Sequence, residues 1–213
     1  MNFFTRYGFC VKFCIVLCLF SLSEISRAQT VIIPFDNAND TSNRKPLGCF
    51  YGYERTHMLY SAAEIGTTGY ITQIGFFLNS AFNPADVTPV VIKMQTTVNT
   101  AISSSIYGAS SASAATVYSG NITSDMLVAN DWVTITLNTP FNYTGDNLEV
   151  FVETNFGGFG GEDYAAKQFR QSQTLSFKCE YWEDDDEPPT DYGIVTHKRP
   201  NVMLTFEAAC SSV

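Results

Sequence analysis

The stretch LGCFYGYERTHMLYSAAEIGTTGYITQIGFFL, residues 47–78, contains the pattern that decides the fold. It opens with a tyrosine-rich run that includes the adjacent charges Glu54 and Arg55, and it closes with an extended run over residues 70–78. Between these runs, residues 62–66 keep no 3.6-residue apolar period for long, so we expect at most one helical turn there. The stretch therefore predicts two β-strands joined by a tight connection.

The same two-residue apolar period continues toward the C-terminus, in residues 70–78, 89–97, 132–137, 147–154 and 201–207. Such alternation is typical of strands that bury one face. We expect these runs to place the following side chains in the core: Ile74, Phe76, Leu78, Val90, Ile92, Met94, Val133, Ile135, Leu137, Leu148, Val150, Val152, Val202, Leu204 and Phe206. The opposite face of residues 147–154 carries Glu149 and Glu153, which we expect to face water.

Further strands are predicted over residues 30–35, 116–120, 166–170 and 174–182. The last of these would place Leu175, Phe177, Cys179 and Tyr181 on one face. Turn-forming residues separate the strands at 36–46, 81–89, 140–146 and 155–161. Residues 99–115, dominated by Ser and Ala, have no period and predict a long, mobile hairpin loop.

Ten or so short strands and no long amphipathic helix predict an all-β fold, an antiparallel two-sheet β-sandwich of the jelly-roll type. An up-and-down barrel is the alternative. We expect one such domain over residues 29–213.

Residues 1–28 have the pattern of a secretory signal peptide. Arg6 and Lys12 precede an uncharged apolar run over residues 13–22, which is too short to span a bilayer, and Ser26 and Ala28 suit cleavage before Gln29. A lipid anchor at Cys18 is the alternative, which the bulky preceding leucine disfavours. The sequence therefore predicts a secreted or cell-surface protein without an integral membrane segment in its mature chain.

Charge and cysteine content exclude several classes of function. The formal charge is −9, and removal of the signal peptide makes it more negative by two units, so a nucleic-acid partner is not expected. Three of six cysteines remain in the mature chain, Cys49, Cys179 and Cys210, without the spacing of a zinc site. One disulfide is expected, with three possible pairings that the sequence does not rank; Cys179 with Cys210 is the pairing we predict, and three separate buried thiols are the alternative.

Three separated motifs carry a resemblance to a known family. They are YGYERTHMLYSAAEIG with GYITQIGF, residues 51–76, then WVTITLNTPFNYTGDNLEV, residues 132–150, and RPNVMLTF, residues 199–206. Together they resemble a jelly-roll-like β-sandwich module of Bacteroidetes secreted and surface proteins, often part of multidomain proteins exported by type IX secretion. The resemblance covers about residues 47–206 and implies a surface module, but it does not indicate which ligand such a module binds. The sorting domain usual for that export route is absent from the sequence.

The sequence assigns no catalytic residue. His57 and His197 are the only histidines, and no G-x-S-x-G elbow or thiol-protease pattern accompanies them. Glu149 and Glu153 would lie about 13 Å apart along one strand, beyond the roughly 5–9.5 Å that a glycosidase pair needs. Glu54 and Arg55 point to opposite faces and are expected to pair with other strands.

The candidate binding residues lie late in the chain. Tyr181 and Trp182 precede the acidic run Glu183, Asp184, Asp185, Asp186 and Glu187, and Tyr192 follows it. Aromatic rings beside carboxylates suit sugar or peptide contact, and clustered carboxylates suit weak calcium binding, although such runs are usually only solvated. We therefore expect a noncatalytic module for adhesion or ligand binding, with a surface glycan or protein as partner and calcium as the one candidate cofactor. A structural spacer domain is the alternative, and a hydrolase a more distant one.

Overall fold

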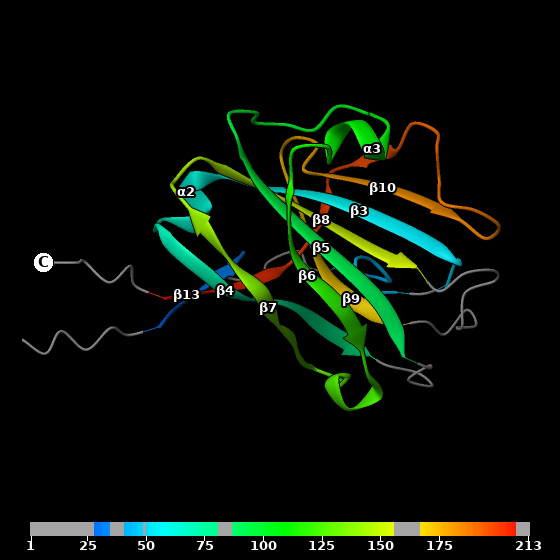
Figure 1. Ribbon diagram of the computed structural model, residues 1–213, viewed down its shortest axis with the longest axis horizontal. Coiled ribbons are helices and arrows are strands. Elements are labelled where there is room, and N and C mark those ends of the chain that lie inside the picture. The colour runs from blue at the N-terminus through cyan, green and yellow to red at the C-terminus, as the bar shows by residue number, and fades with distance from the viewer. Residues whose placement is uncertain (1–27, 35–40, 49, 81–86, 156–166, 208–213) are drawn as a thin grey trace, which may run out of the picture.

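In a computed structural model, the described residues, 28–34, 41–48, 50–80, 87–155 and 167–207, form two antiparallel β-sheets (Figure 1). The first sheet has the order β1-β13-β4-β9-β12, with β7 paired to β4 and β2 paired to β9. Its strands are β1 (Gln29–Ile33), β2 (Thr41–Asn43), β4 (Gly69–Ser80), β7 (Asp131–Tyr143), β9 (Gln168–Gln173), β12 (Lys198–Pro200) and β13 (Val202–Glu207).

The second sheet has the order β11-β10-β3-β8-β5-β6. Its strands are β3 (Tyr53–Tyr60), β5 (Thr88–Thr97), β6 (Ala115–Ile122), β8 (Asn147–Asn155), β10 (Cys179–Asp184) and β11 (Ile194–Thr196). The order β1-β13-β4-β7 in one sheet and β3-β8-β5-β6 in the other interleaves early and late strands, as two Greek keys do in a jelly roll. The predicted sandwich is confirmed, and an up-and-down barrel is excluded because sheet neighbours are mostly not consecutive in the chain.

The helices in the described part of the chain are single turns: α2 (Ala62–Ile65), α3 (Tyr107–Ser110) and the 3₁₀ turn η2 (Ser124–Met126). The turn α2 joins the two sheets, and it begins with a capping box in which Ser61 and Glu64 bond to each other's backbone. Gly66 ends it in the left-handed region, with φ of 68°. None of the described helices could cross a membrane.

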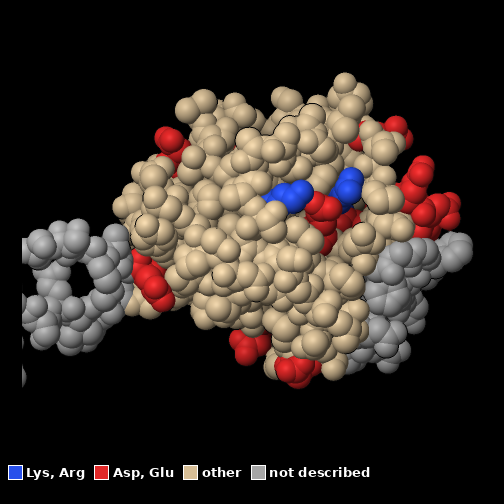
Figure 2. Space-filling model, viewed as in Figure 1, with Lys and Arg blue, Asp and Glu red and all other residues tan. Residues whose placement is uncertain are grey.

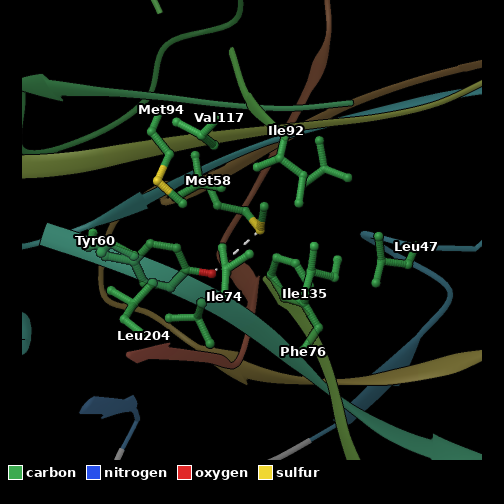
Figure 3. Packing of buried hydrophobic residues seen from close by; sticks show 14 of the residues in the cluster. Leu47, Met58, Tyr60, Ile74, Phe76, Ile92, Met94, Val117, Ile135 and Leu204 are labelled. Atoms are coloured by element: carbon green, nitrogen blue, oxygen red, sulfur yellow. Dashed lines mark hydrogen bonds between the residues drawn. The ribbon is translucent and has the colours of Figure 1, made fainter. Parts of the chain in front are cut away.

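The core lies between the sheets and contains all the alternating side chains that the sequence predicts there. Every one of them is at most 6% exposed. Figure 3 shows how Met58 and Tyr60 of β3 meet Ile74 and Phe76 of β4 across the interface, with the Tyr60 hydroxyl 3.5 Å from the Met58 sulfur. The predicted strand faces are confirmed because each strand buries one side against the other sheet.

Several expected boundaries are wrong. The strand expected over residues 174–182 begins only at Cys179, and Leu175 and Phe177 before it are exposed. The turn expected over residues 140–146 is partly strand, since β7 continues through Pro140, which lies within an irregularity of the β4–β7 pairing. Residues 41–43, expected in a loop, form β2. The expectations for residues 1–27, 36–40, 81–86 and 156–161 lie outside the described residues.

Candidate functional site

Residues 98–114, which join β5 to β6, cover part of the outer face of the six-stranded sheet and are called the covering segment below (Figure 1). The expected hairpin connection is confirmed, since β5 and β6 pair antiparallel. The expectation that it contains no regular element is wrong, because the segment contains α3 and buries Ile102 and Tyr107. Ile102 donates its backbone N–H to the Phe177 carbonyl at 2.8 Å, and Ile106 forms a β-bridge with Tyr192. The segment is therefore tied to both ends of the β10–β11 region.

Packing under the covering segment depends on an aromatic cluster. Tyr107 of α3 lies edge-on to Trp182 of β10 and to Phe151 of β8, with ring centroids 5.1 and 6.0 Å apart. Gly193 lets the chain pass close by, since a Cβ there would lie 2.5 Å from the Trp182 ring. This second, smaller core fixes the covering segment on the sheet.

The predicted aromatic residues do come together, in a pocket at the β10–β11 connection that we call the rim pocket. It has a volume of about 170 Å³ and is lined by Tyr181, Trp182, Glu183, Asp184, Glu187, Pro189, Thr190, Asp191, Tyr192 and Ile194. All three predicted aromatic residues and three of the five acids therefore share one concavity.

Exposure differs sharply among these aromatics. Tyr192 is 69% exposed and Tyr181 is half-buried, whereas Trp182 is only 3% exposed. Trp182 is not exposed together with the two tyrosines, because its indole packs on Tyr107 and its Nε1 donates to the carbonyls of Ser105 and Asp191, both at 3.2 Å. Trp182 thus forms a fixed wall of the pocket, and Tyr192 is its exposed ring.

The acidic run does not act as one cluster. Glu183 pairs with Arg44 and, at 3.0 Å, with the Lys45 ammonium. Asp184 instead accepts the backbone N–H groups of residues 186 and 187 with one oxygen, at 2.8 and 3.1 Å, and these bonds lower the pKa of its carboxyl. Among the described residues, no group of three or more His, Cys, Asp or Glu side chains is arranged to hold a metal ion. Calcium binding by residues 183–187 stays a prediction.

A second polar region lies on the outer face of the six-stranded sheet. Glu153 of β8 forms salt bridges with Lys93 of β5 at 3.0 Å and with Arg55 of β3 at 3.5 Å, and it accepts a hydrogen bond from the Tyr107 hydroxyl at 2.9 Å. Figure 2 shows that, on the face seen there, basic side chains gather at one place beside acidic ones. The expectation that Arg55 pairs with another strand is confirmed by its contact with Glu153 of β8. The same expectation is wrong for Glu54, which pairs at 2.9 Å with Arg44, just after the end of β2.

One row further along this face, His57 of β3 lies between two carboxylates. Its Nε2 is 3.5 Å from Glu149 of β8, and its Nδ1 is 3.6 Å from Glu180 of β10. The imidazole also stacks on Phe151, with ring centroids 4.2 Å apart. Both glutamates are at most 5% exposed, so the expectation that Glu149 faces water is wrong; the covering segment and its neighbours remove it from solvent.

Electrostatics favour a charged imidazole at this position. Burial alone would lower the pKa of His57, but Glu149 and Glu180 outweigh burial and raise it. Burial alone would raise the pKa of Glu149, but His57 and the Gln95 amide, which donates at 2.5 Å, outweigh it and lower that pKa. The raised pKa of His57 and the lowered pKa of Glu149 therefore both favour the charged forms of this pair.

Cys179 lies in the core, 1% exposed, without a disulfide to any other described residue, and its burial raises the pKa of its thiol to about 12. Cys49 and Cys210 lie outside the described residues, so the disulfide between Cys179 and Cys210 stays a prediction. His197, the other histidine, packs on Phe177 with centroids 4.4 Å apart, at a different place from His57.

Neither the protein-family models nor the curated proteins compared with this chain match it.

Proposed function

We propose that this protein is a secreted, noncatalytic β-sandwich module that binds a glycan or protein ligand at the cell surface through the rim pocket. The observation that carries the proposal is the concavity itself, which combines the exposed ring of Tyr192 with the carboxylates of Asp184, Glu187 and Asp191. An aromatic ring can stack on the apolar face of a sugar, while carboxylates accept its hydroxyl hydrogens. The resemblance to surface modules supports the same function.

The pocket is held in shape before any ligand arrives. Trp182 is fixed by two hydrogen bonds, Arg55 donates to the Pro189 carbonyl at 3.0 Å, and Tyr192 pairs with Ile106. A preformed wall reduces the entropy that binding must overcome. This rigidity favours a binding role for the loop.

A structural spacer domain of a longer surface protein is the second candidate, and the burial of Trp182 favours it. A spacer needs no exposed aromatic concavity, and only Tyr192 of the three aromatics is largely exposed. Binding data on Tyr192 therefore separate the two functions.

The test is a glycan array probed with residues 29–213. We expect a bound glycan class for the parent protein and its loss in Tyr192→Ala. Tyr70→Ala is the matched control, because Tyr70 is also an exposed tyrosine, at 43%, but lies on β4 of the other sheet. An empty array would favour the spacer, and equal binding by both variants would show that the rim pocket is not the glycan site. Calorimetry with calcium, alone and with Asp184→Asn, tests the metal prediction separately.

A further inference from the structure

A second cavity, distinct from the rim pocket, lies between the six-stranded sheet and the covering segment. Its volume is about 300 Å³. His57, Gln95 and Glu149 of the sheet line it together with residues of the covering segment, which include Ser103 and Ser105. The loop cavity, as we call it, is therefore polar at its base and bounded by hydroxyl groups.

The base of the loop cavity holds a buried polar group without a hydrogen-bond partner. His57 is 4% exposed, and neither Nδ1 nor Nε2 makes a hydrogen bond. The nearest carboxylate oxygens, on Glu149 and Glu180, are 3.5 and 3.6 Å away, beyond the usual range of about 2.7–3.2 Å. Buried groups left in this way are uncommon and call for a specific partner.

The chemistry of that partner follows from the charges around the gap between His57 Nε2 and Glu149 Oε1. A carboxylate or phosphate would meet Glu149, and an ammonium group would meet the imidazolium, so both are repelled. A hydroxyl can accept from the imidazole and donate to the carboxylate at once. With 3.5 Å between the two atoms, one oxygen can lie within hydrogen-bond distance of both.

We propose that the loop cavity binds one uncharged polyhydroxylated ring, a monosaccharide unit, with a hydroxyl bridging His57 and Glu149. The volume is at the lower end of the roughly 300–1,000 Å³ typical of ligand pockets, which fits one ring and excludes a longer chain. Ala101 and Ile102 add an apolar side on which the C–H face of a sugar can pack. The unit is either a free sugar or the terminal residue of a glycan.

The experiment is saturation-transfer and ¹⁵N NMR on residues 29–213 with free glucose, galactose, mannose, N-acetylglucosamine and their methyl glycosides and disaccharides. We expect at least one sugar to receive saturation and to shift the His57 ring signals. Ala101→Trp should abolish binding by filling the mouth, since Ala101 is exposed and lines the cavity. Ala112→Trp is the matched control, because Ala112 is an exposed alanine of the same segment outside the lining.

Two further variants define the site. Glu149→Gln keeps the shape and should weaken binding about tenfold, as expected for loss of one charge-assisted hydrogen bond. Tyr192→Ala should leave sugar binding at the loop cavity unchanged. The proposal for the rim pocket can therefore be refuted while the proposal for the loop cavity is supported. Equal affinity for methyl glycosides and free sugars indicates a glycan terminus, and preference for free sugars indicates a soluble ligand. No binding by any sugar in the panel, or undiminished binding by Ala101→Trp, overturns the proposal.

Discussion

Replacing Glu64 with Gln should remove an acid-sensitive part of the stability, because this side chain joins α2 to the late strand β12. Both Glu64 carboxylate oxygens accept from the Arg199 guanidinium, at 2.6 and 3.1 Å, and Arg199 also donates to the Leu59 carbonyl at 2.7 Å. Arg199 is 3% exposed and lies over the Tyr60 ring, 4.4 Å from its centroid. The ion pair therefore connects the two sheets at the edge of the core.

The magnitude follows from the shifted pKa. Burial opposes ionisation of Glu64, but Arg199 and Ser61 outweigh it and lower the pKa from 4.5 to about 2. A shift of that size corresponds to about 3 kcal/mol of free energy of unfolding. Since the Glu64 side chain is 35% exposed, solvent screening reduces our expectation to about 2 kcal/mol. The folded pKa is depressed, so this contribution is present above about pH 4.5 and is lost as the pH falls toward 2.

Urea unfolding of the parent protein and Glu64→Gln at a series of pH values measures this contribution. The amide keeps the capping box acceptor, so helix initiation is preserved. We expect the difference in unfolding free energy to be about 2 kcal/mol larger at pH 7 than near pH 2. Glu207→Gln, at an exposed acid of β13, should give no such difference. A difference that stays constant across this pH range would refute the argument, since it would show that charge on Glu64 contributes nothing.

Three further predictions concern buried groups. The pKa of His57 is raised because its two facing carboxylates outweigh burial. The stabilisation by charged His57 is therefore complete below about pH 6.5 and is lost as the pH rises through the pKa of the folded state. The melting temperature should fall with rising pH in the parent protein but not in His57→Gln. Trp182→Ala should cost about 3–5 kcal/mol in urea unfolding, and Tyr192→Ala less than about 0.5 kcal/mol; equal losses would contradict the packing described. Native protein should leave Cys179 unalkylated, and unfolding without reductant should expose it unless Cys210 is bridged to it, which mass spectrometry would show.

The core could be predicted from the sequence because the side-chain period of a strand is a local property. Val90, Ile92 and Met94 are all buried, as their alternation indicates. The same rule, applied to adjacent residues, shows that Tyr181 and Trp182 must point to opposite faces of β10. The two side chains therefore could not both be exposed on one face of β10. Only Tyr192, which lies in a loop, could be largely exposed.

The covered outer face could not be predicted, because its burial depends on contacts between segments far apart in the chain. Glu149 has the sequence pattern of a solvent-facing residue, yet the covering segment lies over it. Phe151 between the two glutamates of β8 was the available signal, since a large aromatic on an open face would be costly. Of the large apolar side chains within the Ser-rich and Ala-rich segment, Ile102 and Tyr107 are buried, whereas Val98 and Ile106 are exposed.

The rim pocket and the loop cavity are not independent, because Ser105 of the covering segment lines the loop cavity and also bonds to Trp182, which lines the rim pocket. The Ser105 carbonyl accepts from Trp182 Nε1 and from the Gly193 N–H, while its own N–H and hydroxyl donate to Glu180 at 2.6 and 2.9 Å. Glu180 in turn faces His57. A large substitution at Ser105 or Trp182 would disturb both sites together, so its effect on binding would not show which site binds the ligand. The two proposed binding sites are therefore best separated by substitutions at exposed edges: Tyr192 borders the rim pocket, and Ala101 borders the loop cavity.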